Sequence, residues 1–501
     1  MAEKFAEIVK RRLVRAKIAR SKHDTWIDDA YRFAFPHREG IGARNSIADF
    51  DELFDDALQF SAEDAANDAI NLFCPRDRRW VEYEAIDLPD AAAYAAVRPD
   101  IETRAEKIFD EINRSNFYQV AETPFQDLMI GTISMIIENS YDLTEPVCCQ
   151  AVRLPSLYLD VGPRGAPGAR FRDEKMAYEN IAATWPEGGQ IAYDGKLRQN
   201  VMQNGDRMGK VVTAMIPEIG PDGRREWRFG CCVDGETIFE RRIAPGPDEP
   251  WIVGRWQTDD VTAIGVGPIF KALTSARMAD QLNYSIFKNI DRVLKPWLFY
   301  DDDGVMNFEG GLPLGAAVPR LPGSKVDVIE SVGRFDIGYF ERDSLEKNIK
   351  RATYQDRPEQ TGDTPPTLGQ WADMKADLAR RRELPGARVI KEFVIPTWLR
   401  FERLLEERGD LEPIIFRDAI VKLKPKSPLL ERAQEEDVSR AERLLGSAGA
   451  LFGPQAVLAI VNAQKTFKNM KERTGDDIIE MNDEEEVATA VKMLLGGGQQ
   501  Q

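Results

Sequence analysis

The reactive groups that stand out first are five thiols, two pairs of which are adjacent in the sequence. Thiolates at such spacing could hold a metal ion if histidines lay close by. The only two histidines, His23 and His37, lie far from both pairs in sequence. An odd number of cysteines in a long chain also argues against a disulfide framework and favours a reducing compartment. We therefore expect free structural thiols and no metal site. The cysteines are Cys74, Cys148, Cys149, Cys231 and Cys232.

Three short stretches could bind phosphate or a cation, and none supports an enzyme. The stretch Gly205–Lys210 is one residue too short for a nucleotide-binding P-loop, and Val211 stands where a Ser or Thr is needed. The stretch 265–268 (GVGP) precedes a helical pattern, but Pro268 lacks the N–H that an anion would use. Three aspartates at 301–303, followed by a glycine, are typical of an exposed turn. Without a GxSxG motif either, we expect no catalytic residues and no cofactor.

Composition limits the kind of partner. The 501 residues are long enough for about three domains, and they carry a net charge of −17. Tight binding of nucleic acid depends on many Lys and Arg residues, so this chain is a poor candidate for it. An acidic protein could still handle DNA without holding it firmly. The longest apolar run, 128–137, is too short to span a membrane, and no signal peptide is visible at the N-terminus. The chain therefore suits a cytoplasm, or something assembled there.

Charge is unevenly distributed. Residues 1–22 hold eight Lys/Arg and two Glu, whereas residues 472–486 hold eight Asp/Glu and one Arg. The basic stretch could be a solvated helix face that pairs with acidic neighbours, or it could contact nucleic acid.

The elements that would position these residues begin with helices. Helical spacing of apolar residues runs to Pro36 and returns at 61–74 and 100–138. Short β-branched and aromatic runs then predict a β-rich region over about 150–260. Its clearest unit is a hairpin, 226–243, turning at Asp234-Gly235.

A long helix follows, from Pro268 to Leu294, and Pro296 ends it. Its single apolar stripe implies lateral packing against other helices. Residues 296–335 form a turn-rich β insert, with strands expected at Trp297–Tyr300 and Lys325–Glu330. Residues 336–353 return to helix, 354–366 form a polar loop, and Thr367–Gln370 opens a helix that runs with breaks to Gly409. The last 75 or so residues are expected to be helical, so the fold class is α+β and predominantly helical.

Five segments, in this order, resemble the portal (head-to-tail connector) proteins of short-tailed bacteriophages. They cover an aromatic stretch ending in proline (31–40), a helix of small residues leading to a Trp (60–84), the long helix with its flanking prolines (265–304), and two late segments (383–413 and 424–445). The order of the five segments matters more than any one of them.

The resemblance implies a dodecameric ring at one capsid vertex, through which double-stranded DNA is packaged and ejected. It implies a wing (1–265 and 368–420), a stem of two helices (266–295 and 336–353) and an α/β clip (296–335). It also implies a tunnel loop (354–367) and a helical crown with an acidic tail (421–501). The partners implied are further copies of the chain, the major capsid and scaffolding proteins, the terminase large subunit and tail adaptor or nozzle proteins. DNA contact would be independent of sequence, no membrane is involved, and the protein would reside in the virion after assembly in the bacterial cytoplasm.

Carried onto this sequence, the resemblance predicts two groups of site residues. A basic band on the second stem helix would lie near the channel, although pairing with Glu341, Asp343 or Glu346 is the alternative for it. The channel residues, including the tunnel loop, are Lys347, Lys350, Arg351, Asp356, Arg357, Glu359, Gln360, Thr361, Asp363 and Thr364. The residues expected to dock the motor and later the tail are Asp301, Asp302, Asp303, Asn307, Glu309, Arg320 and Lys325. A capsid-associated adaptor and a multidomain enzyme with an unrecognised site remain the rival interpretations.

Overall fold

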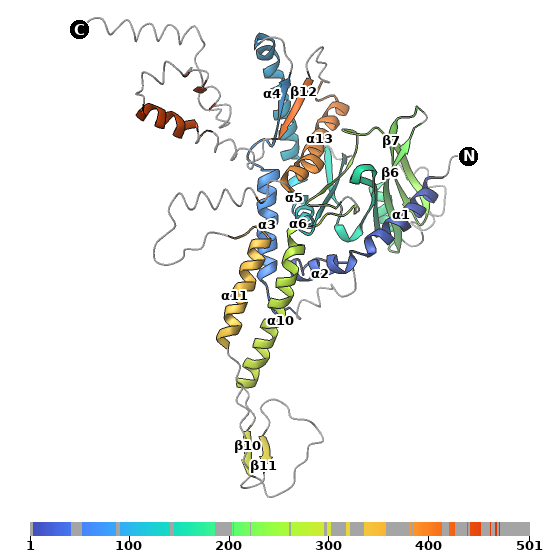
Figure 1. Cartoon of the computed structure of the whole chain (residues 1–501). Coiled ribbons are helices and arrows are strands. Elements are labelled where there is room, and N and C mark those ends of the chain that lie inside the picture. Colours follow the sequence, from blue (N-terminus) through green and yellow to red (C-terminus); the bar gives the residue numbers. More distant parts are fainter. Residues whose placement is uncertain are drawn as a thin grey trace, which may run out of the picture.

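The computed structural model shows a mixed α/β protein with a broad upper part and a narrow helical projection (Figure 1). It describes residues 4–41, 53–86, 91–140, 145–185, 205–220, 222–259, 262–294, 298–301, 317–320, 335–356, 385–412, 420–425 and 441–451, with positions 203, 381, 438, 461, 466, 467 and 470. Strands contribute heavily to the upper part, so the expectation of a predominantly helical fold was too strong.

A five-stranded antiparallel sheet forms one side of the upper part. Its order is β4-β5-β6-β7-β8, and its strands are β4 (Leu157–Val161), β5 (Pro167–Ala177), β6 (Met208–Ile219), β7 (Arg225–Val233) and β8 (Glu236–Ile243). The predicted hairpin is confirmed as β7–β8. Asp234 and Gly235 both adopt positive φ, 49° and 86°, as a tight two-residue turn requires.

The first helix covers one face of this sheet. Helix α1 (Phe5–Ser21) buries Phe5, Val9 and Leu13 against Phe171 of β5 and Ile216 of β6. The predicted helical region up to Pro36 is interrupted at Lys22–His23, after which α2 (Asp24–Ala34) begins. The sheet therefore lies between α1 and the main core, with α7 (Tyr178–Thr184) packed beside it.

A second sheet corrects the sequence-based expectation for residues 132–138. That stretch was expected to continue a helix, but it is strand β2 (Thr132–Asn139), flanked by β3 (Val147–Ala151) and β9 (Trp251–Arg255). Ile133, Ile136 and Ile137 are buried. A central strand that is covered on both faces shows no alternation, so its apolar run looks the same as a buried helix.

Helices pack around this second sheet to form the main core. They are α3 (Ala57–Phe73), α4 (Ala91–Arg114), α5 (Phe117–Val120), α6 (Glu122–Ile130) and α13 (Ile395–Arg408). A π-helical segment, η4 (Ile390–Val394), leads into α13. It is held by Arg255 of β9, whose Nε and Nη2 donate to the two carboxylate oxygens of Glu392 at 3.0 and 2.7 Å. Two 3-10 turns, η2 (Leu154–Ser156) and η3 (Pro163–Gly165), connect strands.

The projection consists of two helices side by side, with a small sheet near its tip (Figure 1). Helix α10 spans Pro268–Leu294, as predicted, and α11 spans Phe335–Ala352. Strands β10 (Leu298–Asp301) and β11 (Ala317–Arg320) pair in parallel. The strand expected at Trp297–Tyr300 is thus confirmed with shifted bounds, β11 was not predicted, and the strand expected at Lys325–Glu330 lies outside the described residues.

One further pairing joins distant parts of the chain. Strand β1 (Val81–Ile86) pairs antiparallel with β12 (Ile420–Pro425). The expected boundary between wing and crown, at residue 420, therefore falls inside a strand. Beyond it, residues 441–451 are helical as expected, whereas the segments 367–370 and 472–501 lie outside the described residues.

Candidate channel and docking surfaces of the stem

The glycines before α10 serve close packing. A Cβ on Gly267 would lie 2.1 Å from the Met129 carbonyl oxygen, and one on Gly265 would lie 2.1 Å from that of Gly131. The backbone amides of this stretch are also engaged: Gly265 N donates to Thr132 Oγ1 at 2.9 Å, and Gly267 N donates to Ile130 O at 2.7 Å. The sequence GVGP therefore fixes the start of the stem helix against the wing and leaves these amides unavailable to an anion.

A short segment before α3 crosses the side of α10, and we call residues 53–56 the strap. Phe54 N donates to Asp280 Oδ1 at 2.7 Å, and Asn283 Nδ2 donates to Asp55 Oδ1 at 3.0 Å. The Phe54 ring lies 4.9 Å from the ring centroid of Tyr284 and 6.3 Å from that of Phe287. Burial, with the neighbouring Asp56 second, raises the pKa of Asp55 to about 6. The strap thus ties α3 to the stem and leaves an aromatic cluster with carboxylates beside it.

Helix α11 presents two different faces. Leu345 and Ile349 are buried. The basic residues predicted to form a band, Lys347, Lys350 and Arg351, are exposed. Lys350 Nζ lies 2.7 Å from Glu346 Oε1, so part of the band is engaged in the helix pair that the sequence offered as the alternative.

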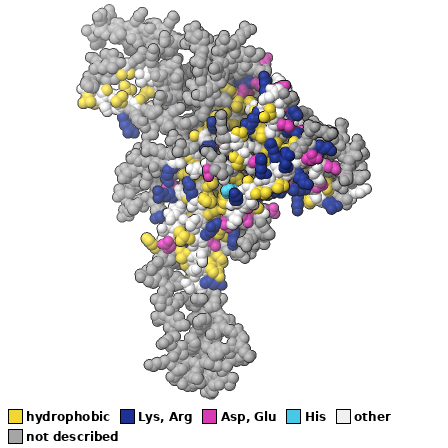
Figure 2. All heavy atoms as spheres, turned by 45° about the vertical axis from the view of Figure 1, so that its right-hand side comes forward, with side chains coloured by type: hydrophobic (Ala, Val, Ile, Leu, Met, Phe, Trp, Pro, Cys, Tyr) yellow, Lys and Arg dark blue, Asp and Glu magenta, His cyan; other side chains and the backbone are white. Residues whose placement is uncertain are grey.

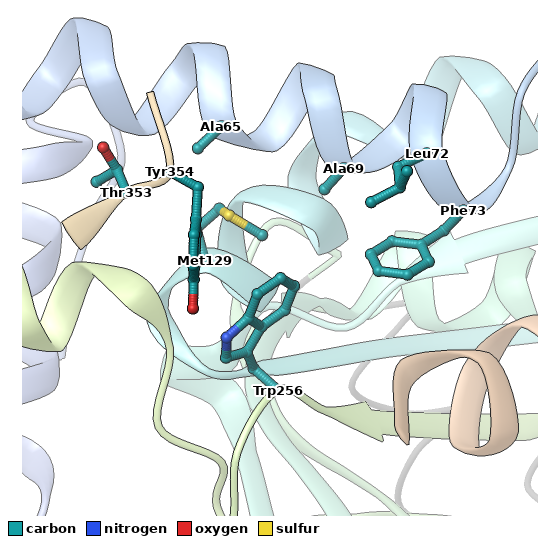
Figure 3. A pocket seen from close by; sticks show the side chains of 8 residues that line it. All are labelled: Ala65, Ala69, Leu72, Phe73, Met129, Trp256, Thr353 and Tyr354. Atoms are coloured by element: carbon teal, nitrogen blue, oxygen red, sulfur yellow. The ribbon is translucent and has the colours of Figure 1, made fainter. Parts of the chain in front are cut away.

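The end of α11 is anchored to the wing (Figure 3). Thr353 Oγ1 lies 2.5 Å from Ser61 Oγ of α3, and both side chains are buried. Tyr354 follows with φ 62°, a left-handed conformation that is uncommon outside glycine. Gln355 N donates to Lys350 O and Tyr354 N to Arg351 O, so the tyrosine occupies the position where a helix of this ending usually carries glycine.

The packing of the Tyr354 ring accounts for a tyrosine, in place of glycine, at this left-handed position. The ring helps to line a small apolar notch, partly open to solvent, beside the residues of α3 (Figure 3). Its centroid lies 5.9 Å from that of Trp256. The other lining residues are Ala65, Ala69, Leu72, Phe73, Met129 and Thr353.

Of the predicted tunnel-loop residues, only Asp356 is described. Its Oδ2 accepts a hydrogen bond from Arg381 Nη2 at 2.7 Å, while the preceding Gln355 donates from Nε2 to Asp68 Oδ2 at 3.0 Å. The first residues after α11, Gln355 and Asp356, are therefore held in place by hydrogen bonds. The remaining loop residues lie outside the described part of the chain: Arg357, Glu359, Gln360, Thr361, Asp363 and Thr364.

Two of the predicted docking residues fall on the small sheet near the tip. The register of β10 and β11 places Asp301 opposite Arg320. The others lie outside the described residues: Asp302, Asp303, Asn307, Glu309 and Lys325.

The basic N-terminal helix has acidic partners in its own sheet. Arg15 pairs with Asp160 of β4, and Lys17 pairs with Asp173 of β5. Arg20 is 2% exposed and donates from Nη1 to three carbonyl oxygens, at Leu154, Pro155 and Leu157. Lys and Arg side chains remain prominent on this side of the wing (Figure 2). Pairing with acidic neighbours, one of the two interpretations of this stretch, is therefore what the contacts show.

Neither a reactive thiol nor a metal site is indicated among the described residues. All five cysteines are free thiols, as expected, and four of them are buried. Burial raises the pKa of Cys74, Cys149 and Cys231, which keeps these thiols protonated. Within the described ranges no cluster of three or more His, Cys, Asp or Glu residues could hold a metal ion. Of the helices described, none has the length and apolarity needed to cross a bilayer.

The structure thus combines a broad α/β part with a projection of two helices and a small sheet near its tip. The chain belongs to the family of bacteriophage head to tail connecting proteins, whose model matches residues 6–477. The resemblance seen in the sequence is therefore confirmed, and the family role is a structural one.

Solved structures give weaker matches. One is a chain from the neck of an empty GTA particle, with 13% identity and a TM-score of 0.39, covering 86% of this chain and 95% of that one. Another is from the virion of a native gene transfer agent particle, with 12% identity and a TM-score of 0.37, covering 88% of this chain and 98% of that one. No curated protein matches the chain.

Two features of the site were missed by sequence reasoning. The strap gives no periodic signal, and its contact with Asp280 lies 226 residues away in sequence. Tyr354 was assigned to the polar loop, because a tyrosine in the sequence does not indicate a left-handed backbone conformation. The signal available for it was a single aromatic residue directly after a helix.

Proposed function

We propose that this protein is the portal of a short-tailed phage: twelve copies form a ring at one capsid vertex. The stems of the ring surround a channel for double-stranded DNA, which a terminase motor packages and which later leaves by the same route. Membership of the connector family supports this proposal, together with the stem projecting from the wing. The protein would be assembled in the bacterial cytoplasm with capsid and scaffolding proteins and would remain in the virion.

The observation that carries the proposal is the apolar surface of the stem. Phe287 and Met278 of α10 are 59% and 52% exposed, and Phe340 of α11 is 76% exposed. Hydrophobic side chains also lie at the surface of the described stem in Figure 2. Large apolar side chains gathered on a thin projection mark a surface that another protein covers. Further copies standing side by side would cover it, and unlike surfaces meeting with a closing rotation make a ring.

A channel wall is available on the side of the stem away from the strap. At about 100° per residue, Thr274, Gln281 and Ser285 lie within about 40° of one another on α10, and about 100° or more from Asp280 and Asn283, which bind the strap. On α11, Ser344 and Asn348 lie about 160° from Glu346, whose charge acts on Asp55 of the strap. We assign this largely polar side to the channel, flanked by Lys288, about 20° from Gln281, and by Arg351, about 20° from Ser344.

Electrostatics favour such a wall for a conduit. Helix α10 has 27 residues, so it is about 40 Å long, and DNA of that length carries about 24 phosphate charges. A wall rich in Lys and Arg would hold those phosphates through many ion pairs. A wall with few Lys and Arg side chains leaves the duplex free to slide.

The loop that begins at Tyr354 and the sheet at the stem tip complete the proposal. We propose that the loop residues 356–366 contact DNA through shape and backbone, and that Asp301, Arg320 and their neighbours dock the terminase and then the tail proteins. For the basic residues Lys347 and Arg351, DNA and the next copy of the chain are two candidate partners outside the chain, whereas Lys350 pairs with Glu346.

Imaging of the purified protein by negative stain tests the ring directly. Closed rings with a central hole are expected, alone or with capsid and scaffolding proteins. Particles that stay single chains under both conditions would exclude the portal and restore the rival interpretations, an adaptor or an enzyme. Removal of residues 356–366 is expected to leave rings intact and to yield leaky or empty heads, and normal filled heads would refute DNA contact by the loop.

A further inference from the structure

Two unlike surfaces lie on the stem and suit each other chemically. The first, which we call the strap surface, consists of Phe54, Asp56, Tyr284 and Phe287. Phe54, Tyr284 and Phe287 are 38%, 41% and 59% exposed, although they are in contact with one another. Its charge is mostly acidic, because Asp56 is exposed and Asp55 and Asp280 lie at its upper edge. One cation, Lys288, lies over the Tyr284 ring at 5.4 Å.

The second surface, which we call the α11 outer surface, consists of Phe340, Lys347 and Arg351. At about 100° per residue these three lie within about 40° of one another. They lie on the opposite side of α11 from the buried Leu345 and Ile349. This surface is therefore aromatic and basic, whereas the strap surface is aromatic and acidic.

The two surfaces point away from each other across the stem. On α10, Tyr284 and Phe287 lie between about 100° and 160° from the half-buried Leu282 and Ile286, and we place Leu282 and Ile286 toward α11. The α11 outer surface in turn faces away from α10. A contact between the strap surface of one copy and the α11 outer surface of the next is thus head-to-tail, the type that repeats around a ring.

The order of residues along the stem also agrees. Helix α10 runs from the wing toward β10–β11, and α11 returns (Figure 1). On the strap surface the carboxylates therefore lie nearer the wing and Phe287 nearer the tip. On the α11 outer surface Arg351 and Lys347 lie nearer the wing and Phe340 nearer the tip. Side-by-side stems would place aromatic against aromatic and acid against base.

We propose that these two surfaces form the contact between neighbouring copies, with Arg351 and Lys347 paired to Asp56 and its acidic neighbours. The proposal rests on the ring proposed above and names the residues that close it. It also assigns Lys347 and Arg351 to the next subunit instead of DNA. Arginine and aromatic side chains are the residue types most enriched where interfaces carry their binding energy.

Charge reversal tests the pairing. Arg351→Glu and Asp56→Arg are each expected to raise the concentration needed for half-assembly about tenfold, because each places like charges opposite one another. The double variant, Asp56→Arg with Arg351→Glu, is expected to recover most of that loss. Lys350→Glu is the matched control, because this lysine is on the same helix but pairs with Glu346 and points to another side. Ring fraction is measured by native mass spectrometry at low and high salt.

A cross-link keeps the test independent of any folding defect. In a Cys148→Ser background, which removes the one exposed thiol among the five cysteines, Phe287→Cys with Phe340→Cys is expected to give a ladder of disulfide-linked chains on oxidation. Phe340→Cys with Met278→Cys, on another side of α10, is expected to give none.

The outcomes separate this inference from the portal proposal. Single reversals that weaken assembly, rescue by the double variant and a specific ladder support it. Wild-type rings with unaffected single variants and no ladder overturn the inference and leave the portal proposal standing. Intact Arg351→Glu rings that lose DNA retention overturn it in favour of DNA contact. Failure of the wild type to form rings at all removes both.

Discussion

Tyr354 offers the sharpest test of how the stem is joined to the loop. It adopts a left-handed conformation at the end of α11, at a cost of about 1 kcal/mol for any residue with a Cβ. Its ring contact with Trp256 contributes about 1 kcal/mol in return. The two terms can be separated, because Tyr354→Ala keeps the strain and loses the ring, whereas Tyr354→Gly loses both.

The expected order follows from this balance. Tyr354→Ala is expected to destabilise the end of α11 by about 1 to 2 kcal/mol, since the notch beside Trp256 is left unfilled. Tyr354→Gly is expected to be about 1 kcal/mol more stable than the alanine variant, which corresponds to about fivefold in local opening. Tyr354→Phe should retain the contribution of the ring, because it keeps the contact with Trp256.

Hydrogen exchange at the Gln355 amide, which donates to Lys350 O at 2.7 Å, reports that opening locally. Gly409 provides an internal reference: it ends α13 with φ 83° and the same pattern of bonds, so Gly409→Ala should accelerate exchange at Asp410. Equal exchange rates in the Ala and Gly variants of Tyr354 would refute the strain, and an alanine variant like the wild type would refute the role of the ring.

Two further predictions concern the strap and the first helix. The raised pKa of Asp55, about 6, means that its ionisation opposes folding, so the stability present at low pH is lost as the pH rises through 6. Asp55→Asn should therefore stabilise the protein at pH 7.5 by about 1 kcal/mol or less, since the carboxylate is partly screened by solvent, and should change little at pH 4.5; a pH-independent difference in thermal unfolding would contradict this. Arg20→Met should weaken the docking of α1 by about 3 kcal/mol, because three buried carbonyl oxygens lose their donor. Trypsin should then cut α1 rapidly, whereas Lys22→Met, at an exposed position, should behave as the wild type.

The sequence was informative wherever local chemistry determines local structure. Pro268 and the apolar stripe after it predicted α10 to its last residue, and Asp234-Gly235 predicted the turn between β7 and β8. The sequence-based prediction was wrong at β2, because a strand buried on both faces shows no alternation of apolar and polar residues. Only Gly131 and three isoleucines favoured a strand there. The strap surface could not be predicted, because Phe54 meets Tyr284 only once two distant segments have folded together.

The candidate site was partly within reach of sequence reasoning. The basic residues of α11 could be placed on one helix, and the pairing of Lys350 with Glu346 was recognised as an alternative. The face that Phe340 shares with Lys347 and Arg351 was not predicted, because an aromatic residue in a helical pattern is ordinarily buried, whereas Phe340 is exposed. Knowing which face is covered requires the position of α10, which no local pattern contains.

The pairing of β1 with β12 can form only late in the synthesis of each chain. The ribosome releases β1 early, but its partner strand ends at Pro425, more than three hundred residues later. At about 10 residues per second, roughly half a minute separates the two strands during synthesis. Throughout that interval the wing lacks this closing strand, and a nascent chain interrupted before β12 would leave β1 unpaired.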